Sequence, residues 1–172
     1  MHRHFPDADI KAFILDMDGV LTDGSVLVLD NGIQARRMHV RDGYALQLAV
    51  KKGYKIAVVS GGTYAPALDR FNKLGITDVY MGVKNKRETV AAYLQGVGVE
   101  RGQAVFMGDD MPDLDVMQSV GYPVCPADAI AEIKSIAVYI SPVTGGHGCV
   151  RDVIEQVLKA KGNWHEEGIA SV

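Results

Sequence analysis

The segment formed by residues 12–25, AFILDMDGVLTDGS, constrains the fold of this chain most strongly. Its first four residues are apolar, which is typical of a short strand buried on both faces of a parallel sheet. The carboxylates Asp16 and Asp18 follow directly, and Gly19 comes next. Ligands of open α/β sheets bind at the carboxyl ends of the strands. Unless this is a solvated turn with incidental acids, two carboxylates and a turn glycine there suit a hard cation and a phosphoryl group.

Size and composition place further limits on the chain. Its 172 residues, 48% of them hydrophobic, predict one globular domain over residues 1–172. A formal net charge of -3 provides no basic surface for nucleic acid, and no apolar run reaches the length of a membrane span. Residues 2–9 contain no apolar segment, so we expect no signal peptide and a cytoplasmic protein. Cys125 and Cys149 are expected to be packed thiols in a reducing compartment.

Residues 25–40 are predicted to form a β-hairpin. Residues 25–29 and 33–40 are the two arms, and the Asn31-Gly32 pair between them favours a type I′ turn. The second arm carries Arg36, Arg37 and His39. A two-stranded hairpin this apolar does not bury itself. We therefore expect it either to fold over the functional site or to pack against another subunit.

The remaining chain alternates strands with helices, which predicts a doubly wound α/β fold with a mainly parallel sheet. Expected strands are 55–59, 76–81, 104–107, 122–125 and 138–140, and expected helices are 44–52, 64–74, one that begins at residue 86, 113–120, 129–134 and 150–160. Asp42 and Asp128 are placed to cap the helices that follow them. The tail, residues 162–172, has no periodicity, so it is expected to be mobile or to dock on a neighbour.

Polar residues recur where the predicted strands end. Residues 60–63, SGGT, form an anion-binding corner or, in the alternative interpretation, a loop in which Thr63 caps a helix. Lys86 begins a helix, where the helix dipole disfavours a cation, so a functional role is more plausible there. A second acidic cluster, GDDMPD at residues 108–113, could hold Mg²⁺ together with Asp16 and Asp18.

A glycine-rich segment, GGHG at residues 145–148, comes before the last predicted helix. His147 in this segment and Arg151 in the first helical turn could contact a phosphate or a carboxylate. A mobile loop with solvated charges is the other interpretation.

Together these segments resemble a known family. DMDGV, VVSGG, Lys86 and GDDMPD are similar to the four motifs of phosphatases in the haloacid dehalogenase (HAD) superfamily. DGVLTDG, HVRDG and GGHGCVR further resemble the 3-deoxy-D-manno-octulosonate 8-phosphate (KDO 8-phosphate) phosphatases. The resemblance implies a capless HAD-like fold with a small hairpin, a cytoplasmic homotetramer, and a magnesium-dependent enzyme of lipopolysaccharide synthesis whose partner is a small phosphorylated sugar acid.

The resemblance also implies roles for individual residues. Asp16 would be the nucleophile that forms an aspartyl-phosphate, and Asp18 would be the general acid and then the general base. The other implied roles are magnesium ligation by Asp16, the Asp18 backbone carbonyl and Asp109, support of the metal by Asp110 or Asp113, phosphate binding by Ser60, Gly61 and Lys86, and binding of the sugar acid by Arg41, His147 and Arg151.

One departure from the family pattern bears on the substrate. The octulosonate enzymes usually have arginine where this chain has Gly62, so a cation near the phosphate or the carboxylate is missing. Phosphatases of nine-carbon ulosonate 9-phosphates have the same motifs and are the alternative within the superfamily. Two alternatives lie outside phosphatase chemistry: a receiver-like domain that is phosphorylated without turnover, and an enzyme-like subunit that only scaffolds a partner.

Overall fold

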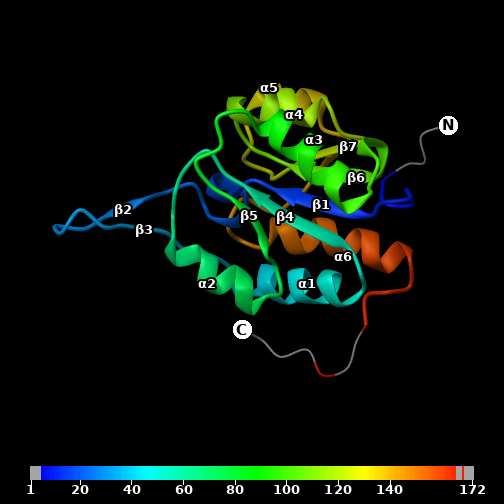
Figure 1. Ribbon diagram of the computed structural model, residues 1–172, viewed down its shortest axis with the longest axis horizontal. Coiled ribbons are helices and arrows are strands. Elements are labelled where there is room, and N and C mark those ends of the chain that lie inside the picture. The colour runs from blue at the N-terminus through cyan, green and yellow to red at the C-terminus, as the bar shows by residue number, and fades with distance from the viewer. Residues whose placement is uncertain (1–4, 166–167, 169–172) are drawn as a thin grey trace.

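The computed structural model describes residues 5–165 and 168, and it has a six-stranded, wholly parallel sheet at its centre (Figure 1). The strands lie in the order β5-β4-β1-β6-β7-β8. Their bounds are β1 (Ala12–Leu15), β4 (Lys55–Val59), β5 (Asp78–Tyr80), β6 (Ala104–Met107), β7 (Tyr122–Cys125) and β8 (Tyr139–Ile140). The predicted doubly wound α/β fold is therefore confirmed.

Helices cover both faces of this sheet (Figure 1). One layer consists of α1 (Val40–Lys51), α2 (Pro66–Lys73) and α6 (Cys149–Ala160), and the other of α3 (Lys86–Val97), α4 (Leu114–Met117) and α5 (Ala131–Ile136). Side chains of β1 alternate between two cores: Phe13 and Leu15 pack in the first layer, and Ile14 packs in the second. Both faces of β1 are thus buried, as its apolar run predicts. Within the described residues, no helix combines the length and apolarity needed to cross a membrane.

The predicted hairpin is present, with strands β2 (Leu27–Val28) and β3 (Gln34–Ala35) paired antiparallel. Its turn is not type I′. That turn needs a positive φ at both central residues, whereas only Gly32 has one, at 80°. The Leu29 N–H donates to Ile33 O at 2.9 Å and the Gly32 N–H donates to Leu29 O at 2.8 Å. The result is a three-residue loop that ends on a left-handed glycine, the next most common hairpin connection.

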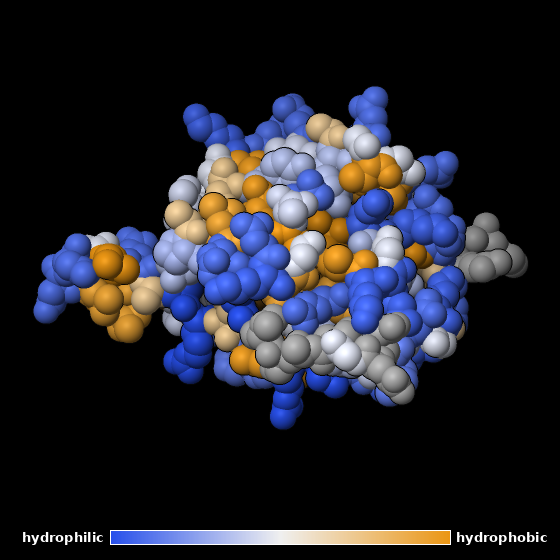
Figure 2. All heavy atoms as spheres, turned by 60° about the horizontal axis from the view of Figure 1, so that its bottom comes forward, coloured by the Kyte–Doolittle hydropathy of each residue, from blue (hydrophilic) through white to orange (hydrophobic). Residues whose placement is uncertain are grey.

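The hairpin projects from the globular body, and apolar side chains are exposed on its arms behind a polar turn (Figures 1 and 2). Leu27 is 64% exposed and Val28 is 67% exposed. The other exposed apolar side chains of the hairpin are Val26, Leu29 and Ile33. A cluster of this kind on a projecting element marks an interaction surface.

The helix α1 begins at Val40, earlier than predicted, and Asp42 does not cap it. His39 is the N-cap, because its Nδ1 accepts a hydrogen bond from the Arg41 N–H at 3.2 Å. Asp42 is instead buried in the first turn, where its Oδ1 accepts from the Arg151 N–H of α6 at 2.7 Å. Burial raises the pKa of Asp42 to about 6 although this hydrogen bond opposes the rise. Asp42 thus caps α6, which is distant in sequence, and not α1, the helix that contains it.

The predicted Asp128 cap is wrong, and so is the alternative interpretation in which Thr63 caps a helix. α5 begins at Ala131, and the Asp128 carboxylate accepts from the Gly145 N–H at 2.9 Å, so Asp128 holds the glycine-rich loop. α2 begins at Pro66, which suits a first helical position, so Thr63 is not its cap. Cys125 and Cys149 are buried free thiols, as expected. Part of the predicted tail, residues 166–167 and 169–172, lies outside the described residues.

Candidate active site

Three adjacent strands bring the predicted functional residues to one edge of the sheet. β4, β1 and β6 are neighbours, and Ser60, Asp16 and the segment containing Asp109 follow their carboxyl ends. The Asp16 N–H donates to Met107 O at 3.0 Å, which ties the start of the first acidic segment to the end of β6. These residues share a cavity of about 390 Å³ whose other lining residues include Asp18, Gly61, Gly62, Lys86, Asp110 and Asp113.

The backbone after Asp16 brings the two acidic segments into contact. The chain makes one wide turn, η1 (Met17–Leu21), which the Thr22 N–H closes by donating to Met17 O at 3.0 Å. Gly19 has a φ of 89°, and a Cβ at this position would overlap the Asp109 carboxylate. Glycine is required here both for the left-handed backbone and for the close approach of Asp109.

Lys86 is buried between two carboxylates. Its Nζ donates to Asp16 Oδ1 at 2.8 Å and to Asp113 Oδ1 at 2.7 Å. Burial alone would lower the pKa of Lys86, but the charges of Asp16 and Asp113 outweigh it and the pKa is raised. Lys86 is therefore a fixed positive charge beside Asp16, as its position at the start of α3 led us to expect.

The carboxylates at this edge fit a divalent cation. Oxygens of Asp16, Asp109 and Asp113 lie within 4.8 Å of one another. Burial, together with neighbouring carboxylates, raises the pKa of Asp16 to about 6 and that of Asp109 to about 7. Among the described residues, none donates a hydrogen bond to the Asp109 side chain. A bound cation would relieve this crowding of negative charge.

The supporting acids have protein partners of their own. Asp113 Oδ1 is held by Lys86, and its Oδ2 accepts from the Asp109 N–H at 3.0 Å. Asp110 Oδ1 accepts from the Met111 N–H at 2.8 Å. This arrangement leaves Asp16 and Asp109 as the side chains best placed to ligate Mg²⁺, with Asp113 orienting the segment, and these assignments stay predictions.

The residues predicted to bind phosphate line the cavity beside Asp16. Ser60 is buried, and its Oγ accepts from the Gly62 N–H at 3.2 Å. Gly61 is exposed in the same loop and has no side chain to block the approach of an anion. Their contact with a phosphoryl group stays a prediction, although Ser60, Gly61 and Lys86 now share one cavity.

Arg36 is a site residue that sequence reasoning missed. It follows β3 of the hairpin, and its Nε donates to Asp18 Oδ1 at 2.8 Å while its Nη2 donates to Oδ2 at 3.3 Å. The guanidinium also lies 4.8 Å from the centre of the Tyr64 ring, and the side chain is only 8% exposed. Arg36 and Arg37 are adjacent in the sequence, and no local pattern indicated which of the two would contact the site.

The three residues expected to bind the sugar acid lie elsewhere. Arg41, His147 and Arg151 line one cavity of about 510 Å³, and none of them lines the cavity that contains Asp16. Arg151 Nε contacts Glu155 Oε2 at 3.0 Å, and its guanidinium lies 5.3 Å from the Trp164 ring centre. The structure thus brings the three together but not to Asp16, and their role in substrate binding stays a prediction.

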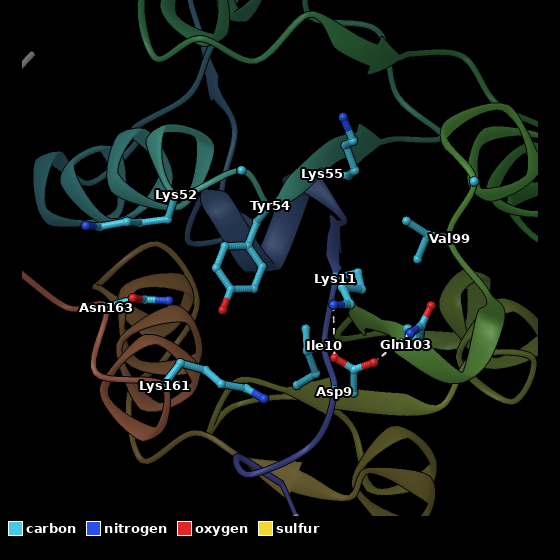
Figure 3. A pocket seen from close by; sticks show the side chains of 12 residues that line it. Asp9, Ile10, Lys11, Lys52, Tyr54, Lys55, Val99, Gln103, Lys161 and Asn163 are labelled. Carbon is cyan, nitrogen blue, oxygen red and sulfur yellow. Dashed lines mark hydrogen bonds and ion pairs between the residues drawn. The ribbon is translucent and has the colours of Figure 1, made fainter.

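A cavity of about 470 Å³ lies at the opposite, amino edge of the sheet (Figure 3). Its lysines are Lys11, Lys52, Lys55 and Lys161. Lys52 and Lys161 are the C-cap residues of α1 and α6, where a helix dipole favours a cation. The Lys11 Nζ pairs with Asp9 at 3.1 Å. Lys11, Lys52 and Lys161 thus have structural roles, so the carboxyl edge of the sheet remains the candidate site.

Comparison with known proteins agrees with this geometry. The family model for haloacid dehalogenase-like hydrolases matches residues 76–153. The 3-deoxy-D-manno-octulosonate 8-phosphate phosphatase KdsC of Escherichia coli (strain K12) is 35% identical over 158 residues, which cover 92% of this chain and 84% of that protein. The chain belongs to the KDO 8-phosphate phosphatase family. Membership of this family of HAD hydrolases confirms the expected enzyme class and removes the receiver-like alternative.

Solved structures of the family have the same fold. The phosphatase of Yersinia pestis is 32% identical, with a TM-score of 0.90 over 96% of this chain and 89% of that one. The phosphatase of Moraxella catarrhalis is 31% identical, with a TM-score of 0.87 over 91% and 90% of the two chains. The latter structure holds a magnesium ion, a phosphate ion and a KDO molecule.

Proposed function

We propose that this chain is a magnesium-dependent phosphomonoesterase that hydrolyses KDO 8-phosphate to KDO and phosphate. The observation that carries the proposal is that Asp16 and Asp18 share one cavity with Lys86, whose Nζ lies 2.8 Å from Asp16 Oδ1. A carboxylate that attacks a phosphate dianion needs its charge neutralised, and Lys86 supplies a cation at that position. The family relationship supports the same reaction.

The first half of the reaction uses Asp16 as the nucleophile. An oxygen of Asp16 attacks phosphorus, the bond from phosphorus to the sugar oxygen breaks, and Asp18 gives its proton to that leaving oxygen. Lys86 and the Ser60 hydroxyl hold the phosphoryl oxygens. When bound, Mg²⁺ would sit on Asp16, Asp109 and the Asp18 carbonyl and would neutralise charge on the phosphoryl group.

The second half releases phosphate. Asp18, now ionised, takes a proton from a water molecule as that water attacks the aspartyl-phosphate. The phosphorus bond to Asp16 breaks, inorganic phosphate forms, and both carboxylates return to their starting states. Lys86 then remains beside Asp16 for the next substrate.

A substrate panel tests this function. We expect kcat/KM to be highest for KDO 8-phosphate, lower for KDN 9-phosphate and N-acetylneuraminate 9-phosphate, and lowest for glucose 6-phosphate. A chelator should abolish turnover and Mg²⁺ should restore it. Equal turnover of glucose 6-phosphate and the best sugar acid would refute recognition of a sugar acid. Preference for a nine-carbon substrate would instead support a phosphatase of ulosonate 9-phosphates. Gly62 is compatible with that alternative, because glycine leaves more room for the substrate than arginine does.

We also infer a cytoplasmic homotetramer in which the hairpins pack together and a neighbour helps to cover each site. The exposed apolar arms of the hairpin around Leu27 and Val28 support this assembly, because an isolated projection of this kind is unfavourable in water. Val28→Asp is expected to convert the tetramer to smaller species in light scattering at micromolar concentration, whereas Asp30→Asn in the turn should not. A wild-type monomer under these conditions would contradict the inference.

A further inference from the structure

We propose that Arg36 recognises the carboxylate of the sugar-acid substrate, and that this recognition frees Asp18 for catalysis. The inference rests on the proposed function and deepens it. It concerns the substrate-free structure, in which the Arg36 guanidinium holds both oxygens of Asp18, at 2.8 and 3.3 Å.

Arg36 lies behind Asp18, which lines the cavity on the side where the organic part of the substrate must sit. The phosphoryl group meets Asp16, whose own cation is Lys86 at 2.8 Å. The leaving oxygen, with the sugar attached to it, meets Asp18. A cation paired with Asp18 and not with Asp16 therefore faces the sugar, so a charge on the sugar is its natural ligand.

The present partner of Arg36 shows which kind of charge fits. Its guanidinium makes a two-point contact with a carboxylate, the geometry in which arginine binds such groups most strongly. The Tyr64 ring lies 4.8 Å from the guanidinium carbon and supports one face of the group. A substrate carboxylate presents the same two oxygens as Asp18, so it can take the place of Asp18 as the partner of Arg36.

Gly62 makes room for this arrangement. A Cβ built on Gly62 would lie 3.4 Å from Asp18 Oδ2 and 3.9 Å from Arg36 Nη2. The guanidinium therefore lies beside the space that a side chain at position 62 would enter. The hairpin residue Arg36 thus supplies a positive charge in a place where Gly62 cannot supply one.

The exchange of partners has a consequence for selectivity. A neutral sugar phosphate offers no carboxylate to Arg36, so Asp18 stays engaged and the leaving oxygen lacks free access to it. A sugar acid engages Arg36 and leaves the Asp18 oxygens accessible. Arg36 is thus a substrate-binding residue that also controls access to Asp18.

The test compares Arg36→Gln with the matched control Arg37→Gln, since Arg37 is exposed on the same arm. The readout is kcat/KM for KDO 8-phosphate divided by kcat/KM for glucose 6-phosphate. We expect Arg36→Gln to lower this ratio roughly 10- to 100-fold, the range for a lost charge-assisted contact, and Arg37→Gln to leave it within about twofold. The inhibition constant of free KDO should rise in Arg36→Gln, while that of inorganic phosphate should not.

Moving the arginine from position 36 to position 62 provides a second test. Gly62 does not have a positive φ, so the backbone tolerates a side chain there. In the Arg36→Ala background, Gly62→Arg is expected to restore at least part of the ratio. With Arg36 present, Gly62→Arg should not raise the ratio, because two guanidinium groups would compete for one space.

The outcomes separate this inference from the proposed function. If the wild-type enzyme prefers KDO 8-phosphate and a folded Arg36→Gln protein keeps the full preference, the role of Arg36 is wrong and the proposed function stands. If the wild-type enzyme shows no preference for sugar acids, the proposed function fails. Should Arg36→Gln not fold, Arg36→Lys keeps the charge but loses the two-point contact, and an unchanged ratio in that variant would overturn the inference.

Discussion

Asp16→Asn is expected to abolish turnover of KDO 8-phosphate, with kcat/KM falling by on the order of 10⁴-fold or more. The amide cannot attack phosphorus to form an acyl-phosphate, so the covalent intermediate is lost together with the steady-state rate. Lys86 keeps Asp113 as a partner at 2.7 Å, which should leave the fold intact. Steady-state assays with rapid quenching for acid-labile phosphate on the protein measure both effects.

Asp23→Asn is the matched control for this prediction. Asp23 follows in the same loop, but its Oδ1 accepts from Ser25 and it does not line the Asp16 cavity. Asparagine can accept the same hydrogen bonds, so activity should stay within about twofold of wild type. Residual turnover above one-hundredth of wild type in Asp16→Asn, in a preparation free of wild-type enzyme, would exclude Asp16 as the nucleophile.

Lys86→Met is expected to lower kcat/KM by roughly 10²- to 10³-fold, because a preorganised charge next to the phosphoryl group is lost. It should also destabilise the protein by about 3 kcal/mol at pH 8, since the buried carboxylates of Asp16 and Asp113 lose their common cation. Lys86 opposes the rise in the pKa of Asp16, so its removal raises that pKa further above the ordinary value. Because folding then favours the protonated form of Asp16, the loss of stability should shrink as the pH falls from 8 to 5.

The control for Lys86 is Lys84→Met. Lys84 is an exposed lysine two residues earlier in the same loop, so its loss should change activity less than twofold and stability by less than about 0.5 kcal/mol. Denaturant unfolding at pH 5 and pH 8 measures the stabilities. A Lys86→Met protein as stable and as active as Lys84→Met would show that the buried ion pairs contribute neither to folding nor to catalysis.

The features that sequence patterns predicted correctly depend on short-range signals. An apolar run followed by Asp16, another followed by Ser60 and a third followed by GDDMPD each identify a strand and its carboxyl end. Parallel topology then brings such ends together, because β4, β1 and β6 are neighbours. Lys86 was found in the same way, through its unfavourable position at a helix start.

The features that were missed depend on contacts between distant segments. Asp42 has the right residue type for a local cap, but its partner is the Arg151 N–H, and no nearby pattern reveals that pairing. Arg36 reaches Asp18 because of the direction in which the hairpin leaves the body, which depends on packing. Arg41 and Arg151 were grouped with the substrate by motif alone, whereas the structure places them in another cavity.

The strands that pair with β1 are synthesised much later than β1 itself, and this order determines when the active site can form during synthesis. β1 is made near the start of the chain, yet its two neighbours are β4 and β6, and the acceptor for the Asp16 N–H is Met107 O. A chain emerging from the ribosome therefore carries both catalytic carboxylates long before Asp109 exists. Parallel pairing across such separations folds slowly, because the intervening loops must close first. Activity thus appears late in biogenesis, after most of the polypeptide has been synthesised.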